Sequence, residues 1–251
     1  MILMAASIRM RTVPMTCGDK KFRTILVMDI LNGIVVHAMK GERSKYRPIE
    51  NSRVCDSSDP FDIISAVGPS EVYIADLDHI TRIGDNFGLI KKISAETKTM
   101  VDIGVKNTDD IHQCAAIADT VIIGTETASL DVIEKAAVRL PGRIDVSIDM
   151  KNGMVLTEDR EMDRSPEELL KRLDEFDLKD IILLDLGKVG TGAGINKAFI
   201  KKMAGISVHN ILVGGGIKDL DDIETLKESG ACGALVATAV HNGKIPIALI
   251  H

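Results

Sequence analysis

Residues 27–35 read VMDILNGIV, and residues 147–155 read SIDMKNGMV. Each stretch has an aspartate after a short apolar run, and Asn-Gly three residues later. Three further pairs of segments match in the same order and at a similar offset: 74–77 with 183–186, 104–111 with 216–223, and 122–125 with 235–238. Ordered matches at a nearly constant offset indicate an internal repeat. The sequence therefore predicts two similar halves.

From Arg23 onward, short β-branched runs alternate with amphipathic stretches, which is typical of βα units around a parallel sheet. Helix starts are marked by caps such as Ser165 before Pro166. The predicted strands are 24–28, 72–75, 99–101, 121–123, 144–148, 181–184, 210–213 and 234–236. Eight predicted strands, divided between two similar halves, predict an α/β fold. We expect a (βα)8 TIM barrel built from two fused (βα)4 half barrels.

Residues 1–21 lack this periodicity and also lack the charged-then-apolar order of a signal peptide. We interpret residues 1–21 as an N-terminal extension and residues 22–251 as a single TIM-barrel domain. Because the extension has no face to bury, its deletion should leave the melting temperature nearly unchanged. A thermal melt of a chain that starts at Phe22 checks this, and a fall of many degrees would contradict it.

The composition excludes several classes of protein. An apolar fraction of 45% with 27% charged residues indicates a globular chain with a large core, and its apolar runs are too short to span a membrane. A net charge of -6 without tryptophan argues against a nucleic-acid partner. Cys17, Cys55, Cys114 and Cys232 form no CxxC pair, which fits reduced thiols in the cytoplasm. We expect a cytoplasmic monomer or small homo-oligomer.

Aspartates follow the predicted strands, and the carboxyl ends of barrel strands face the active site in TIM barrels. The aspartates are Asp29, Asp76, Asp102, Asp149 and Asp185. The repeat places Asp29 and Asp149 on opposite sides of the barrel mouth, which suits a general base and a general acid acting on one small substrate. Asp76 and Asp185 are as readily interpreted as loop caps.

Glycine-rich turns predict phosphate binding in the second half. Gly214, Gly215 and Gly216 precede a helix signal, and Ala237-Thr238 follows the last strand, so bare amides can reach a phosphate. These loops are the usual phosphate site of TIM barrels. The alternative interpretation is that the three glycines serve only to form a tight turn and bind no ligand.

The first half offers a weaker counterpart of this turn. Its candidate residues are Gly104, Lys106, Gly124 and Thr125. Asp102 stands where the second half has Gly214, and its carboxylate repels phosphate.

The loop of residues 187–194, GKVGTGAG, lacks the glycine spacing of a dinucleotide-binding turn. We interpret it as a flexible loop that presents Thr191, with Gly192 as a further substrate-binding candidate. His37, His79 and His112 are dispersed and favour surface or loop positions over a metal site. We expect neither a metal nor a cofactor.

These residues resemble the HisA/HisF family of histidine-biosynthesis barrels, most of all ProFAR isomerase (HisA). The resemblance spans residues 22–243 and is carried by 27–36 with Lys40-Gly41, 147–149, Gly190-Thr191, 214–217 and 122–125. It implies that Asp29 and Asp149 are the base and acid of an Amadori rearrangement, in which an aminoaldose becomes an aminoketose, and that Thr191 assists. It also implies one phosphate site in each half for a bisphosphate substrate.

Several family positions differ in this chain. The first-half Gly-Gly-Gly-Ile-Arg is replaced by residues 102–106, DIGVK, and the last-strand Gly-Arg or Gly-Lys by Ala237-Thr238. The hairpin arginine is His37, an aspartate beyond the threonine is Asn196, and a substrate-covering tryptophan is absent. Asp29, Asp149 and Thr191, which the resemblance implies are catalytic, are therefore kept, while residues at the substrate-binding positions of the family differ. This pattern is similar to HisA-related archaeal paralogues.

The sequence thus predicts a HisA-like sugar-phosphate isomerase of the aldose-ketose type, acting on a phosphorylated small molecule without a cofactor. Two alternatives remain open. One is a phosphometabolite-binding barrel without turnover, since fold does not fix function. The other is a HisF-like cyclase, which would need a glutaminase partner or ammonia.

Overall fold

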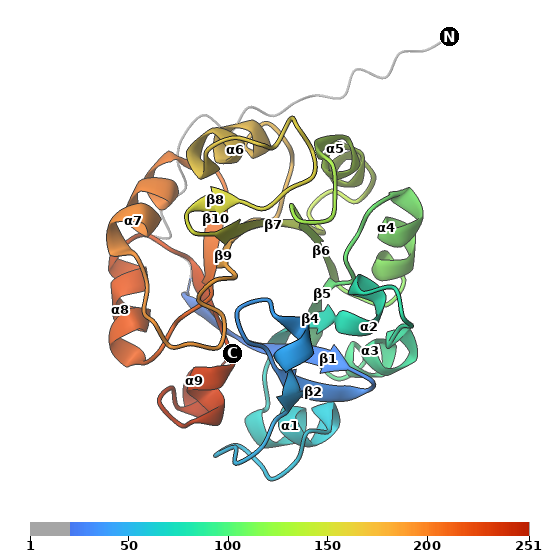
Figure 1. Ribbon diagram of the computed structural model, residues 1–251, viewed down its shortest axis with the longest axis vertical. Coiled ribbons are helices and arrows are strands. Elements are labelled where there is room, and N and C mark those ends of the chain that lie inside the picture. The colour runs from blue at the N-terminus through green and yellow to red at the C-terminus, as the bar shows by residue number, and fades with distance from the viewer. Residues whose placement is uncertain (1–20, 251) are drawn as a thin grey trace.

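The computed structural model describes residues 21–250, and its centre is a closed barrel of eight parallel strands (Figure 1). The last strand pairs with the first, with Arg23 opposite Gly233. In order around the barrel the strands are β1 (Arg23–Leu31), β4 (Glu71–Asp76), β5 (Lys98–Asp102), β6 (Thr120–Gly124), β7 (Ile144–Lys151), β9 (Asp180–Asp185), β10 (Asn210–Gly214) and β11 (Gly233–Val236). All predicted strands are confirmed, and the fold is a (βα)8 TIM barrel.

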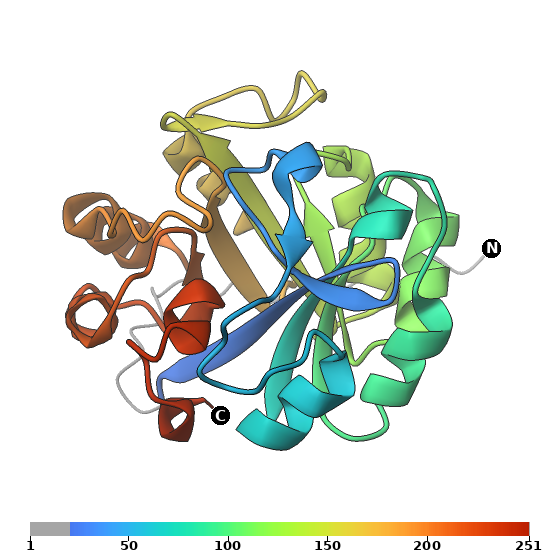
Figure 2. The same cartoon turned by 60° about the horizontal axis from the view of Figure 1, so that its bottom comes forward.

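Helices surround the barrel and alternate with its strands (Figures 1 and 2). They are α1 (Pro60–Val67), α2 (Leu77–Ile80), α3 (Phe87–Ile93), α4 (Thr108–Ala115), α5 (Leu130–Arg139), α6 (Pro166–Leu173), α7 (Lys197–Ile206), α8 (Leu220–Glu228) and α9 (Thr238–His241), with 3-10 turns η1 (Arg43–Lys45) and η2 (Ile247–Leu249). The predicted start of α6 is confirmed, because Ser165 and Glu168 form a reciprocal capping box.

Side chains of successive strand residues point alternately into the barrel and toward the helices. On β1, Ile25 belongs to the core inside the barrel, whereas Leu26 packs in the layer between sheet and helices. On β9, Ile182 and Ile181 divide in the same way. Strands buried on both faces explain why the apolar runs of the sequence are continuous.

The two halves repeat the same hairpin. β1 turns back into β2 (Ile34–His37), which also pairs with β3 (Arg47–Pro48), and β7 turns back into β8 (Met154–Val155). Asn32 and Asn152, at the two turns, both adopt the left-handed conformation, with φ of 52° and 55°. The matching hairpins confirm the half-barrel repeat.

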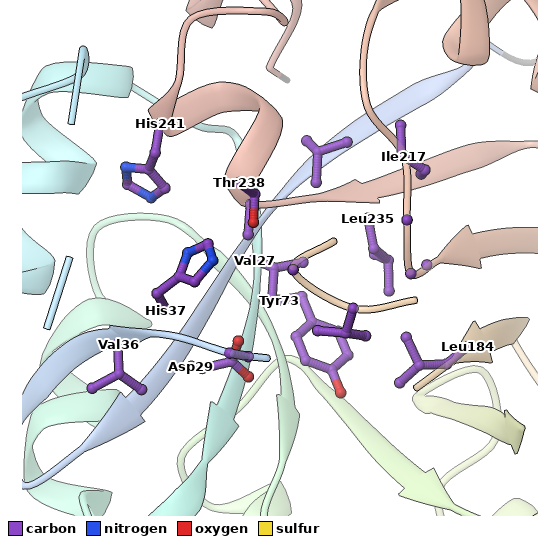
Figure 3. Close-up of a pocket in the computed structure, with 18 of the residues that line it drawn as sticks. Val27, Asp29, Val36, His37, Tyr73, Leu184, Ile217, Leu235, Thr238 and His241 are labelled. Atoms are coloured by element: carbon purple, nitrogen blue, oxygen red, sulfur yellow. The ribbon is translucent and has the colours of Figure 1, made fainter. Parts of the chain in front are cut away.

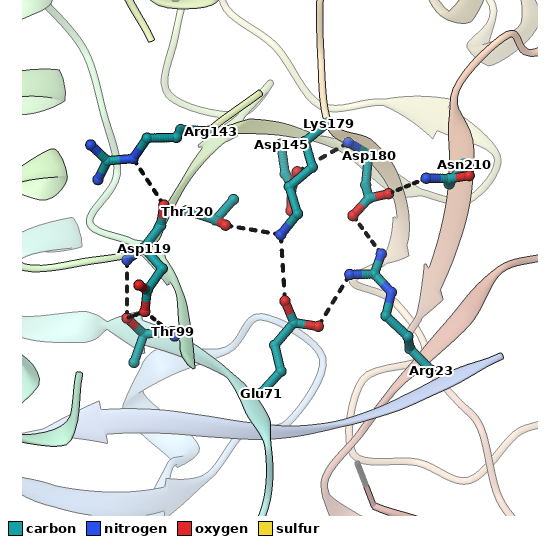
Figure 4. A network of polar contacts seen from close by, with 10 residues as sticks. All are labelled: Arg23, Glu71, Thr99, Asp119, Thr120, Arg143, Asp145, Lys179, Asp180 and Asn210. Atoms are coloured by element: carbon teal, nitrogen blue, oxygen red, sulfur yellow. Dashed lines mark hydrogen bonds and ion pairs between the residues drawn. The ribbon is translucent and has the colours of Figure 1, made fainter. Parts of the chain in front are cut away.

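Ion pairs close the barrel at the amino-terminal ends of its strands (Figure 4). Arg23 donates to Asp180 and, at 3.1 Å, to Glu71, which also accepts from Lys179 at 3.4 Å. Asn210 donates its side-chain amide to Asp180 at 2.7 Å. Because active sites lie at the opposite face in TIM barrels, this network serves stability.

Asp145 lies in the same network and is fully buried. Its Oδ1 accepts from the backbone N–H of Asp180 at 3.1 Å, while its Oδ2 has no partner among the described residues. Burial, reinforced by the Asp180 carboxylate, raises the pKa of Asp145 well above its usual value. The folded chain therefore keeps a proton that the unfolded chain releases above about pH 4.

Replacing Asp145 by asparagine should flatten the pH dependence of stability. With native Asp145 protonated, the free energy of unfolding falls as pH rises, by up to about 1.4 kcal/mol per pH unit. Asp145→Asn keeps the Oδ1 acceptor and cannot ionise, so its stability relative to the parent should grow from about pH 5 to about pH 8. Urea unfolding at the two pH values measures this, and an unchanged difference would contradict the assignment.

The predicted extension, residues 1–21, falls almost entirely outside the described residues. Among residues 21–250, no helix is long and apolar enough to cross a membrane.

Candidate active site

Three strand-end carboxylates lie at the carboxyl-terminal mouth of the barrel. Asp29, Asp102 and Asp149 belong to β1, β5 and β7, the first, third and fifth strands around the barrel. Asp29 and Asp149 are therefore on opposite sides, as the repeat predicts, and Asp102 lies between them.

Asp149 is held by hydrogen bonds and is 6% exposed. The Ser147 hydroxyl donates to its Oδ1 at 2.7 Å, and the Glu126 amide donates to its Oδ2 at 3.3 Å. Burial nevertheless raises the pKa of Asp149 to about 7. A Cβ on Gly124 would come within 2.7 Å of Asp149 Oδ2, so this glycine makes room for the carboxylate.

Asp29 is half-buried and lines a pocket at the barrel mouth. Its desolvated position and, next in size, the Asp102 carboxylate raise the pKa of Asp29 to about 7. Burial raises the pKa of Asp102 to about 6. When two opposed carboxyl groups both have a pKa near neutrality, one can be ionised while the other is protonated. This is the condition for paired base and acid catalysis.

The pocket extends from Asp29 to the glycine-rich loops of the second half (Figure 3). Candidates that line it with Asp29 are Gly192, Gly214, Gly215, Gly216, Ala237 and Thr238. Gly215 and Gly216 have φ of 91° and 86°, and a Cβ on Gly215 would lie 2.3 Å from the Asp185 carbonyl. Glycine is therefore required here for the loop to lie against β9. The amides of Gly215 and Gly216 have no acceptor among the described residues.

The first-half candidates do not line this pocket. Gly104 donates its amide to Asp102 Oδ1 at 2.8 Å, and the amide of exposed Lys106 donates to Asp110 at 2.8 Å. Thr125 is fully buried and its hydroxyl accepts from the Asp149 amide at 3.0 Å. The contact of Lys106 is repeated in the second half, where the Lys218 amide donates to Asp222 at 3.0 Å, so the difference between the two turns is the Gly104 amide, which is taken by Asp102.

Thr191 also turns toward its own loop. Its hydroxyl donates to the Lys188 carbonyl at 2.7 Å and accepts from the Ala193 amide at 3.1 Å. The neighbouring Gly190 and Gly192 line the pocket, whereas Thr191 itself does not. Its assisting role stays a prediction.

Asp76 and Asp185 have different surroundings. Asp76 is fully buried and accepts from the Asn86 amide at 2.8 Å, the Asn86 side chain at 2.7 Å and the His79 amide at 3.2 Å, which makes it a loop cap. Asp185 is half-exposed, pairs with Lys188 at 3.7 Å and lines a second pocket outside the barrel.

Further residues of the site were not predicted. Tyr73 lines the pocket from inside the barrel and donates to Asp102 Oδ2 at 3.4 Å. His37, expected at the surface or in a loop, also lines the pocket, together with His241 (Figure 3). Arg43 and Glu126 form an ion pair at 3.6 Å near the mouth. The only sequence signal for His37 was its place at the hairpin arginine of the family.

Within residues 21–250, no group of three or more His, Cys, Asp or Glu side chains is arranged to hold a metal ion.

The barrel consists of two similar halves, and its strand-end carboxylates and glycine-rich loops lie at one mouth. The chain is therefore a (βα)8 barrel protein of the class built from two half barrels. The chain belongs to the histidine biosynthesis protein family, whose sequence model matches residues 23–246.

Relatives in this family cover nearly the whole chain. An uncharacterized protein of Methanocaldococcus jannaschii is 35% identical over 232 residues, 90% of this chain and 96% of that protein. A protein of Nitrosopumilus maritimus that is named as the isomerase of a phosphoribosylated imidazole-4-carboxamide, ProFAR isomerase, is 25% identical over 236 residues, with 90% of this chain and 96% of that protein covered. The corresponding isomerase of Lactococcus lactis is 28% identical over 236 residues, with 89% and 95% covered.

Proposed function

We propose that the chain is a HisA-like isomerase that converts a phosphorylated aminoaldose into an aminoketose. The observation that carries the proposal is the opposed pair Asp29 and Asp149, each with a pKa of about 7 at the mouth of a histidine-biosynthesis barrel. Isomerase relatives at 25% and 28% identity support the reaction type.

In the proposed reaction Asp29 is the base and Asp149 the acid. Asp149 donates its proton to the ring oxygen of the aminoaldose, and the C1–O bond breaks as the amine nitrogen forms a C1=N iminium with its lone pair. Asp29 then removes the proton from C2, which gives the enolamine. Asp29 returns its proton to C1 and the ionised Asp149 accepts the proton of the C2 hydroxyl, which gives the aminoketose and restores both carboxyl groups. Each positioned proton transfer contributes roughly 10²- to 10⁴-fold. This chemistry requires only proton transfers.

The pKa values predict a bell-shaped pH profile for kcat/KM. The base must be ionised, so activity should fall below about pH 7, and the acid must be protonated, so activity should also fall above about pH 7. Initial rates between about pH 5 and pH 9 measure both limbs. A rate that keeps rising to the alkaline end would show that no carboxylic acid is needed.

A thermal-shift screen of phosphorylated metabolites tests the proposed substrate class. A ligand present at 100 times its Kd stabilises the folded chain by about 2.7 kcal/mol. Ligands that raise the melting temperature are then assayed for conversion to a ketose. If no aminoaldose phosphate binds or reacts, the proposal fails.

A phosphometabolite-binding protein without turnover is the second candidate. The hydrogen bonds that hold Thr191 within its own loop favour it, because the assisting group is turned from the pocket. A ligand that stabilises the parent chain and the Asp29→Asn variant equally, and is never converted, would support this candidate.

A further inference from the structure

Small residues separate the three aspartates of the barrel mouth. Asp29 and Asp102 are both register partners of Ala75, so one strand, β4, lies between them. Register partners in a parallel sheet point to the same face, and Ala75 belongs to the core inside the barrel. Both carboxyl groups therefore point into the barrel on either side of the Ala75 methyl group. Their Cα atoms are two strand spacings, about 10 Å, apart.

Gly124 leaves a similar gap on the other side of Asp102. A Cβ at Gly124 would lie 2.7 Å from Asp149 Oδ2 and 4.0 Å from Asp102 Oδ2, so these two carboxyl groups border one space. At this level β4 contributes only a methyl group and β6 only a hydrogen atom. The Asp102 carboxyl group therefore lies between the proposed base and the proposed acid, with a small residue on each side.

Two donors fix the position of the Asp102 side chain. The Gly104 amide donates to its Oδ1 at 2.8 Å, and the Tyr73 hydroxyl donates to its Oδ2 at 3.4 Å. Tyr73 is 5% exposed, and burial together with the nearby aspartates raises the pKa of its phenol well above its usual value. The phenol therefore stays protonated as a donor. Both hydrogen bonds favour the ionised form of Asp102.

Other charged groups also surround Asp102. Besides burial, Glu126 raises the pKa of Asp102 and Arg43 lowers it, and these two side chains pair at 3.6 Å, so their effects oppose each other. The ionisable groups near Asp102 are Asp29 on β1, Tyr73 on β4, His79 on α2, Cys114 on α4, Glu126 after β6, Asp149 on β7 and Arg43 on η1.

We propose that Asp102 is a positioning residue whose negative charge makes Asp29 and Asp149 hold their protons more strongly. This inference rests on the proposed function, in which Asp29 is the base and Asp149 the acid. A stronger hold makes Asp29 a better base toward the C2 proton and keeps Asp149 protonated near neutral pH. Gly214 stands at the matching position of the second half, so this charge is not part of the repeat.

The electrostatic environment of the two carboxyl groups agrees with this role. After burial, the Asp102 carboxylate is the next largest cause of the raised pKa of Asp29. Burial also raises the pKa of Asp149 most, the Ser147 hydroxyl opposes it, and the Asp102 carboxylate adds to it. A like charge close to a carboxyl group disfavours its ionised form.

Nuclear magnetic resonance titration of the full chain, labelled with isotope in its aspartate carboxyl groups, tests the inference without a substrate. Asp29→Asn and Asp149→Asn identify the two signals. In Asp102→Asn both titration midpoints should fall by roughly 0.5 to 1 pH unit, for charges about 10 Å apart at an effective dielectric of about 20 to 40. Asp185→Asn, at a half-exposed strand end outside the barrel, is the matched control and should shift both midpoints by less than about 0.2 pH unit because water screens it.

Asp102→Gly separates the charge of Asp102 from its hydrogen bonds. Asparagine at position 102 can still accept from the Gly104 amide, whereas glycine cannot, so similar shifts in both variants would trace the effect to the charge. Unchanged midpoints in Asp102→Asn would overturn the inference, as would an equal shift in Asp185→Asn. Melting temperatures show whether each variant is folded, and if Asp102→Asn is not, unchanged midpoints in Asp102→Gly would overturn it.

Kinetics provide a second readout on a substrate that the parent chain converts. Both limbs of the kcat/KM profile should move to lower pH in Asp102→Asn by about the shift of the midpoints. A merely structural role would lower the rate at every pH and leave the limbs in place. If no substrate is converted, the isomerase proposal fails, while the titration still decides whether Asp102 acts on the two carboxyl groups.

Discussion

Asparagine at position 29 or 149 is expected to lower kcat by roughly 10²- to 10⁴-fold on the substrate that the parent chain converts. Asparagine has nearly the shape of aspartate but neither takes nor gives a proton at neutral pH. The side chain of Asp29 has no hydrogen bond to a described residue and lines the pocket, so its replacement should leave the melting temperature nearly unchanged. Steady-state kinetics and thermal melts of both variants measure the two effects.

Asp76→Asn provides the contrasting variant, because Asp76 also stands at a strand end but serves as a loop cap. Its carboxylate accepts from two backbone amides and from the Asn86 side chain. The side-chain N–H of an asparagine in its place would be buried against the N–H groups from which the carboxylate accepts. The free energy of unfolding should therefore fall by about 1 to 3 kcal/mol. Near-normal kcat in Asp29→Asn or Asp149→Asn would refute the catalytic assignment. For Asp29, whose side chain accepts no hydrogen bond from a described residue, a stability loss like that of Asp76→Asn would indicate a structural role.

Most of the fold could be predicted because its signals are local and repeated. Each barrel strand is a β-branched run long enough to stand out, and the repeat fixes how the halves correspond. β8, only two residues long, carries no alternation and was not predicted. The strands also extend beyond the predicted bounds, as β7 does to Lys151, because the hairpin with Met154 continues the pairing.

The candidate site could be predicted only in part. Asp29 and Asp149 follow from strand ends and symmetry. The direction of the Thr125 side chain cannot be predicted in this way, because its hydroxyl contacts the Asp149 amide only when β6 and β7 are paired. His241 lies beyond the last barrel strand, and its burial depends on Ser52 from a distant loop. Contacts across the closed barrel leave no trace in local sequence patterns.

The two phosphate sites that the family resemblance implies should be unequal in this chain. Gly104 and Gly216 are equivalent positions of the two halves. The Gly216 amide has no acceptor among the described residues, whereas the Gly104 amide is bound to Asp102 Oδ1 at 2.8 Å. In the first half, therefore, the Gly104 amide is taken and the Asp102 carboxylate lies beside it, while the guanidinium of Arg82 donates to the Gly104 carbonyl at 2.8 Å and to Asp110 at 3.2 Å. A monophosphate should accordingly be a better ligand than ProFAR.

A crystal soaked in phosphate or sulfate should thus show an anion beside Gly216 and none beside Gly104. The repulsion from Asp102 is on the order of 1 to 4 kcal/mol for charges about 4 Å apart at intermediate dielectric. Asp102→Gly removes this repulsion and frees the Gly104 amide, so a second anion should appear. Asp102→Asn removes the charge but still offers an oxygen to that amide, so it should give lower occupancy than Asp102→Gly. Equal, full occupancy beside Gly104 and Gly216 in the parent chain would refute the asymmetry and favour an ordinary bisphosphate substrate.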